Sequence, residues 1–154
     1  MKKLSLVLLL CLSASLTYSQ EVSFRSGQEK HNHKPALFTQ TAAKSAVQTP
    51  FLEEMLNYTV GQQVKVVLAG NVRFTGTVTA RTSDAPGLLT IMVHSADVNG
   101  LVFSISRIQV PGAAVEYRGM LMSMAHSDML MLEKDPVTGT YAWNKKQVSR
   151  MLAD

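Results

Sequence analysis

From Gly61 onward, apolar and polar residues alternate with a period of two, which is the spacing of β-strands with one buried face. The clearest strand covers residues 72–81, where Val72, Phe74 and Val78 point one way and arginines and threonines point the other way. Further apolar runs lie near residues 64–68, 88–94, 101–106, 115–124, 129–133 and 140–144. Turn-forming residues, such as Asn99-Gly100, separate them. The pattern predicts about seven strands.

The connections between these strands are too short for crossover helices, so neighbouring strands should run antiparallel. We expect a mainly all-β fold, an antiparallel meander curled into a partly closed barrel or a two-layer sheet. Gly76, in the middle of a strand, predicts a bend or bulge. One short helix is expected at residues 49–57, with Thr49 as its cap and Pro50 as its first helical residue. Its apolar stripe should pack on the sheet.

The most distinctive stretch is residues 118–133, which predicts a hairpin turning at residues 125–128. A loop centred on His126-Ser127 would pair Met124 with Met129 and Met122 with Met131. Directly opposed residues of an antiparallel pair share a face. The four methionines are therefore expected on one face, with Leu121, Leu130 and Leu132 on the other.

Three interpretations of these methionines remain open. They could be flexible core filler beneath the helix, since methionine adapts to irregular space. They could form a docking surface for a protein partner, made of Met120, Met122, Met124, Met129 and Met131. Because thioethers are soft ligands, Met122, Met124, His126, Met129 and Met131 could instead bind Cu(I), with Trp143 as a shield.

The first 19 residues are typical of an export signal: Lys2 and Lys3, an apolar run at residues 4–16, and small residues before Gln20. We predict a signal peptide at 1–19, a polar, poorly ordered leader at 20–48 and one β-rich domain at 49–154. Removing the signal takes Cys11, the only cysteine, and lowers the formal net charge from +4 to +2. The mature protein is expected to be periplasmic or secreted, with no membrane span and no internal disulfide.

Motifs for catalysis and for nucleic-acid binding are lacking in the sequence. His94, His126, Asp84 and Asp128 could meet in space, and a small hydrolase would join a histidine and a carboxylate to a nucleophile such as Ser127. Turn aspartates, however, mostly bond to local backbone. In the leader, His31 and His33 form only a two-histidine fragment of a metal site. We therefore predict no enzymatic activity and no cofactor, with copper as the alternative.

Several short motifs resemble one known family. They are FTGTV at residues 74–78, FSISR at 103–107, YRGM at 117–120, HSD at 126–128 and VSRMLAD at 148–154. Together they are similar to the β-rich segment between signal peptide and catalytic domain in exported bacterial reprolysin-like zinc metallopeptidases. The resemblance covers about residues 45–154, and no zinc motif is present. It implies a propeptide-like or accessory module and carries over no active-site residue.

Taken together, the sequence predicts an exported, non-enzymatic binding or accessory module that acts through a protein partner. The alternative is a periplasmic Cu(I)-binding protein that uses the methionine-rich hairpin.

Overall fold

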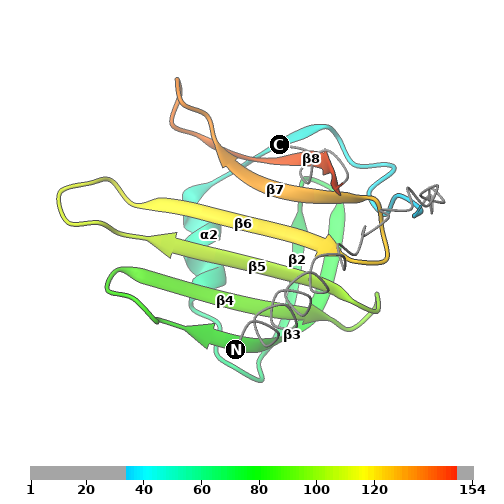
Figure 1. Ribbon diagram of the computed structural model, residues 1–154, viewed down its shortest axis with the longest axis horizontal. Helices are drawn as coiled ribbons and strands as arrows, with labels where there is room; N and C mark the ends of the chain where they lie inside the picture. Colours follow the sequence, from blue (N-terminus) through cyan, green and yellow to red (C-terminus); the bar gives the residue numbers. More distant parts are fainter. Residues whose placement is uncertain (1–33, 149–154) are drawn as a thin grey trace, which may run out of the picture. The chain divides into compact units, whose positions relative to one another are not determined.

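A computed structural model describes residues 34–148 and contains a single eight-stranded antiparallel sheet with one short helix (Figure 1). The strands are β1 (Lys44–Val47), β2 (Gln63–Leu68), β3 (Val72–Thr82), β4 (Leu88–Ser95), β5 (Leu101–Ile108), β6 (Glu116–Ser123), β7 (Asp128–Lys134) and β8 (Tyr141–Gln147). The helix, α2, spans Thr49–Leu56. From β2 to β8 each strand pairs with the next in sequence, which confirms the predicted meander.

The sheet curls into a half-barrel whose edge strands are β1 and β2. At one end, two side-chain hydrogen bonds join the parts of the chain beside these edges. The Ser45 hydroxyl donates to the Ala69 carbonyl at 3.0 Å, and the Asn71 amide donates to the Gln40 carbonyl at 3.0 Å. Strong curl gives the sheet a concave side and a convex side. The two sides have different surroundings.

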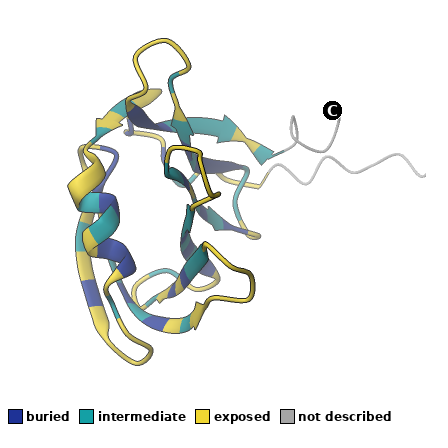
Figure 2. Cartoon of the chain, turned by 90° about the vertical axis from the view of Figure 1, so that its left-hand side faces the viewer, coloured by how far each residue is buried: buried dark blue, intermediate teal, exposed yellow. Residues whose placement is uncertain are grey.

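The concave side holds the hydrophobic core. Phe74, Phe103 and Trp143 lie there in a row across the sheet, with ring centroids 5.7 Å and 6.0 Å apart. Helix α2 packs against β4 and β5 on this side, with Leu52, Met55 and Leu56 buried (Figure 2). The predicted packing of the helix on the sheet is therefore confirmed.

The start of α2 differs from the prediction. Thr49 is the first helical residue, Gln48 occupies the N-cap position, and no side chain caps the helix. Pro50 still lies within the first turn, where its missing N–H costs no hydrogen bond. The apolar stripe, and not a cap, fixes the position of this helix.

Strand β3 contains the predicted irregularity, but not at Gly76. The register with β4 shifts between Val78 and Ala80, which places the bulge at Thr79 and turns Ala80 toward the convex side beside Met92. At Gly76 itself, an added Cβ would collide with the His94 carbonyl of β4. Glycine is therefore needed there because the two backbones approach closely.

The domain begins earlier than the predicted boundary at residue 49. Residues 34–43, called the N-terminal strap here, lie against the β7–β8 hairpin, and β1 follows them. Phe38 in the strap is 4% exposed and belongs to the core. The interpretation of residues 20–48 as a poorly ordered leader is thus wrong for residues 34–48. β1 is the eighth strand, added to the seven that the sequence predicted.

Between residues 34 and 148, no helix has the length and apolar character needed to cross a lipid bilayer. The predicted signal peptide, its cysteine and the His31–His33 fragment lie outside the described residues.

Candidate functional site

The predicted methionine hairpin exists as β6 and β7, but its register differs from the prediction. Met122 pairs with Met129 and Met120 pairs with Met131. The turn covers residues 124–127, one position earlier than expected, because the Ser123 carbonyl accepts from the His126 N–H while the Ser123 hydroxyl accepts from the Ala125 N–H. Met124 therefore lies in the turn and is 72% exposed. Four methionines still share one face, but the fourth member of the set is Met120 and not Met124.

These four residues, Met120, Met122, Met129 and Met131, are called the methionine face. They lie on the convex side of the sheet, because Leu121, Leu130 and Leu132 of the same hairpin are buried on the concave side with α2. The interpretation of the methionines as core filler beneath the helix is therefore wrong. The helix covers the opposite side of the sheet.

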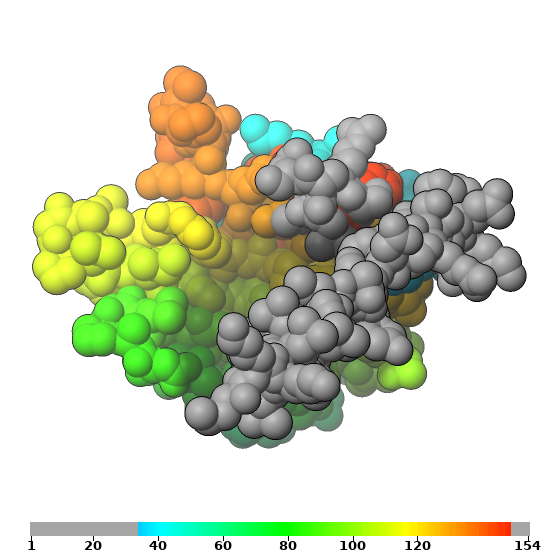
Figure 3. Space-filling model, in the orientation of Figure 1, coloured from blue at the N-terminus to red at the C-terminus, as the bar shows by residue number. Residues whose placement is uncertain are grey.

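The methionine face is only partly shielded from solvent. Met129 is 3% exposed, while Met120, Met122 and Met131 are half-buried. Within the described residues, no second layer packs on this side of the sheet. Figure 3 views this side of the molecule, with loops projecting around part of its edge.

The surroundings of the methionine face are mixed. Ser104 lies next to Met120 in the register and Val102 lies next to Met122, while Met92 follows one strand further on. Two ion pairs on β6, β7 and β8 border the face: Arg118 with Glu116 at 3.0 Å, and Lys146 with Glu133 at 3.0 Å. The patch is therefore apolar at its centre and close to electrically balanced at its border.

Trp143 does not shield the methionine face, contrary to the prediction. It faces the concave side of β8, where it pairs with Leu132 and is 1% exposed. Its ring reaches as far as β6, since a Cβ added to Gly119 would lie 3.0 Å from Trp143 Cη2. Gly119 therefore makes room for the indole. The indole Nε1 is buried without a hydrogen-bond partner among the described residues.

A polar cluster that the sequence analysis missed attaches α2 to the sheet. Glu53 accepts hydrogen bonds from the Tyr117 hydroxyl and from the Arg107 guanidinium, the latter at 3.2 Å. The Tyr141 hydroxyl accepts from the Tyr117 N–H at 3.0 Å, and the two tyrosine rings meet edge to face. Burial, followed by the interaction with Glu53, raises the pKa of Tyr117 to about 12. These partners lie 54 and 64 residues apart in the sequence, so no local pattern could reveal them.

The predicted acid–base candidates do not come together as a catalytic set. Asp128 is 1% exposed and its carboxylate accepts from the N–H groups of Leu37 and Phe38, at 2.6 Å and 3.0 Å. It therefore holds the N-terminal strap, and it is the first residue of β7 instead of a turn residue. His126 lies in the adjoining turn with its Nδ1 buried and unpartnered. The hydrolase alternative would need a histidine, a carboxylate and Ser127 in contact, and no such hydrogen bonds occur among the described residues.

The strap makes further contacts with β8 and with the turn between β6 and β7. Lys145 Nζ donates to the carbonyls of Phe38 and Thr41, each at 3.2 Å. The Ser127 N–H donates to the Pro35 carbonyl, and Lys34 Nζ donates to the Met124 carbonyl. These bonds fix the strap across one end of the half-barrel.

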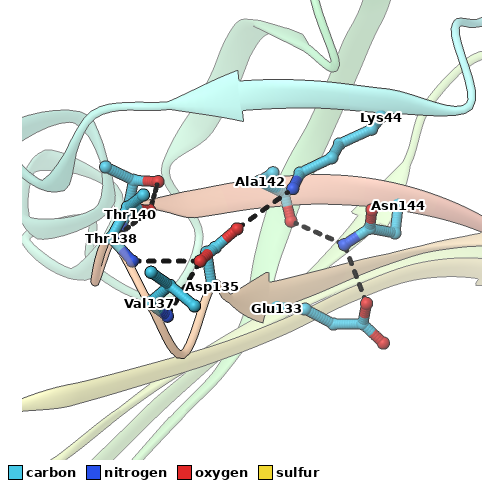
Figure 4. Close-up of polar contacts among 8 residues, drawn as sticks. All are labelled: Lys44, Glu133, Asp135, Val137, Thr138, Thr140, Ala142 and Asn144. Carbon is cyan, nitrogen blue, oxygen red and sulfur yellow. Dashed lines mark hydrogen bonds and ion pairs between the residues drawn. The ribbon is translucent and has the colours of Figure 1, made fainter.

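Polar contacts also gather at the β7–β8 turn (Figure 4). The Asp135 carboxylate accepts from the N–H groups of Val137 and Thr138, both at 3.0 Å, and lies 3.4 Å from Lys44 Nζ. The two backbone bonds are the main reason why the pKa of Asp135 is lowered. Asp135 thus organises the turn, which is a structural role.

A small hollow of about 160 Å³ lies at the β7–β8 turn, and two larger ones lie elsewhere on the described surface. One, of about 290 Å³, lies between the strap and the turns at Asn71 and Val98. The other, of about 320 Å³, lies where β6 and β7 diverge beyond Gly119 and Leu132. This second large hollow is lined by Glu116 and Glu133, which are ion-paired with Arg118 and Lys146.

No protein family, curated protein or solved structure was found to match this chain.

Proposed function

We propose that this chain is an exported, non-enzymatic binding module that seats its methionine face in a concave, apolar surface of a protein partner. One observation carries the proposal: Met120, Met122, Met129 and Met131 occupy adjacent positions on the side of the sheet that α2 does not cover, and all but Met129 are partly exposed. Patches of apolar side chains left at a protein surface are typical of interaction sites.

The shape and chemistry of the patch favour a cleft as the partner surface. The sheet curls toward α2, so its other side is convex and fits a concave surface. Methionine side chains have three rotatable bonds and adapt to the shape that they meet. Since the border charges are already paired within the domain, the apolar centre should supply most of the binding free energy.

The resemblance to propeptide-like segments agrees with this proposal, because such a module would work by covering a cleft of its partner. The position of the methionine face is also suitable. The described chain enters at Lys34 and leaves at Val148 beside the turn at residues 124–127, next to this face. Segments attached at either end would therefore start close to the docked partner.

The absence of catalysis is part of the proposal, and the roles of the polar residues support it. Glu53, Arg107 and Tyr117 attach the helix, Asp128 holds the strap, and Asp135 organises a turn. Each of these groups already has partners that explain its position.

The test combines crosslinking with a binding measurement. The protein carrying a photoreactive methionine analogue is exposed to an exported-protein fraction from its source, and the crosslinked protein is identified and purified. The crosslinks should map to the methionine face. In calorimetry with the purified partner, Met122→Lys should weaken binding by more than about 100-fold, because a charge would be buried in an apolar interface.

Val137→Lys is the matched control. Val137 is apolar and 91% exposed, but it lies at the tip of the β7–β8 turn, away from the face. The Val137→Lys substitution should leave the affinity for the purified partner unchanged. Equal affinities for the Met122→Lys and unsubstituted proteins, or crosslinks that map only to other surfaces, would overturn the proposal.

A further inference from the structure

The register of β6 and β7 places four methionine side chains next to one another on one face of the sheet. Met122 is opposite Met129, and Met120 is opposite Met131. Opposed residues of an antiparallel pair have Cα atoms about 4.5–5.5 Å apart, and residues two apart on one strand lie about 7 Å apart. Each side chain is long enough to bring its sulfur to the centre of this square. The arrangement requires no change of the backbone.

The chemistry of this donor set is specific. Thioethers are neutral, soft ligands that suit Cu(I) and have little affinity for hard cations such as Mg²⁺ or Ca²⁺. Residues 34–148 hold no group of three or more histidine, cysteine, aspartate or glutamate side chains that could bind a metal ion. A competing site for a borderline metal is therefore lacking in that range. The nearby carboxylate of Glu133 is already engaged by Lys146 and Asn144.

The degree of burial also suits a monovalent soft ion. Met129 is 3% exposed and its three neighbours in the square are half-buried. Such a site is partly screened from water, yet open enough for an ion to enter without unfolding the hairpin. Met120, Met122 and Met131 are half-buried and do not belong to the core cluster on the concave side, so their side chains have room to adjust on binding.

We propose that Met120, Met122, Met129 and Met131 form a Cu(I)-binding site on the convex side of the sheet. The site differs from the one that the sequence suggested. Met124 lies in the turn, 72% exposed, and is replaced by Met120. His126 is left out because it lies in the turn and not among the four paired positions of β6 and β7. The proposal does not depend on docking of a protein partner, since four thioethers can bind the ion alone.

Competition against a chromogenic Cu(I) chelator, under anaerobic reducing conditions, tests the site. The unsubstituted protein should bind one Cu(I) per chain. Met122→Leu with Met129→Leu should weaken binding by more than about 100-fold, because leucine keeps the volume and removes the sulfur. Met92→Leu and Met124→Leu are matched controls, being methionines on the same side and in the same hairpin, and should bind as the unsubstituted protein does.

Further measurements distinguish thioether ligands from imidazole ligands. Thioethers do not protonate, so the affinity should stay constant from about pH 7.5 to about pH 5, whereas protons would displace an imidazole ligand over that range. Binding should also persist in a variant with His31→Asn and His33→Asn. In spectra of methyl-labelled methionine, Ag(I), a stable analogue of Cu(I), should shift four methyl signals and leave those of Met92 and Met124 in place.

The proposal is overturned if the Met122→Leu, Met129→Leu variant binds Cu(I) as tightly as the unsubstituted protein, or if no stoichiometric binding occurs. Loss of Cu(I) binding in the His31→Asn, His33→Asn variant, which retains all four methionines, would also overturn the proposal. The leucine variants preserve an apolar surface, so they should still dock a protein partner. Failure of the copper site and failure of the docking proposal are thereby distinguishable.

Discussion

The two sides of the β6–β7 hairpin differ in residue type and in surroundings, although the same strands carry both. On the concave side Leu121, Leu130 and Leu132 are at most 4% exposed and contact aromatic rings and neighbouring strands. On the convex side the corresponding positions are methionines, most of them half-buried. A branched side chain suits a site of fixed shape, and a flexible one suits a site whose contacts vary. The residue types therefore separate the permanent core from a surface with changeable contacts.

The largest expected difference between the two sides is in the free energy of unfolding. Leu130→Ala should lower it by about 2–5 kcal/mol, because Leu130 is fully buried and the cavity cannot fill. Met131→Ala, one residue further along the same strand, should lower the free energy of unfolding by less than about 1.5 kcal/mol. Urea denaturation of both variants measures the difference. Equal losses would mean that the convex side is also covered in the folded protein.

The second largest effect concerns the carboxylate that holds the strap on the concave side. Asp128→Asn should lower the free energy of unfolding by about 1–3 kcal/mol, because a single amide oxygen replaces two acceptors for the Leu37 and Phe38 N–H groups. Hydrogen exchange at these two amides should accelerate. Asp84→Asn, at an exposed loop position, is the control and should change neither quantity. Unchanged exchange in Asp128→Asn would show that the strap is held by its other contacts.

The attachment of α2 to the concave side should depend on pH. The pKa of the Tyr117 phenol is raised from 10.0 to about 12 in the folded protein, so the unfolded chain loses this proton first as the pH rises. The contribution to stability is therefore complete below pH 10 and is lost between about pH 10 and 12. Thermal unfolding followed by circular dichroism should show this decline.

Tyr117→Phe should cost about 0.5–1.5 kcal/mol at neutral pH, through loss of the bond to Glu53, and should remove this part of the decline. Tyr58→Phe, a partly buried tyrosine beside the core, should retain the decline. An identical pH dependence for Tyr117→Phe and the unsubstituted protein would contradict the assignment.

The smallest effects should distinguish members of the convex side from each other. Met124→Ser should change the free energy of unfolding by less than about 0.5 kcal/mol, since Met124 is 72% exposed in the turn. Met129→Ser should cost about 1–2 kcal/mol, because Met129 is 3% exposed. Urea denaturation can resolve this difference. Equal effects would mean that the hairpin follows the predicted register, in which Met124 opposes Met129.

The sequence predicted the strands well because alternation is a local property. Strands β2 to β8 all follow runs of alternating residues, and the short turns between them allow only antiparallel neighbours. β1 was missed because it is four residues long and lies in a polar stretch, where only pairing with β8 defines it. The bulge at Thr79 was misplaced to Gly76 because a glycine in a strand marks either a bulge or a close approach of backbones.

The candidate site was predicted in part. Alternation placed Met122, Met129 and Met131 on one face, but the choice between neighbouring turns decided whether Met124 or Met120 completes the set. That choice depends on Ser123 and on Asp128, whose partners at Leu37 and Phe38 are about 90 residues away. Which side of the sheet the helix covers is likewise set by long-range contacts, so the sequence could not exclude a buried role for the methionines.

Lys34 and Val148, the first and last described residues, both hydrogen-bond to the turn at residues 124–127, which has a consequence for how this domain can be joined to other sequences. A unit whose entry and exit points are neighbours can be inserted into a surface loop of a host protein without stretching that loop. The same geometry allows the two points to be joined by a short linker while new ends are opened at the exposed loop between β3 and β4. Such a circular permutant should retain the order of strands, because every pairing in the sheet is independent of where the chain is cut.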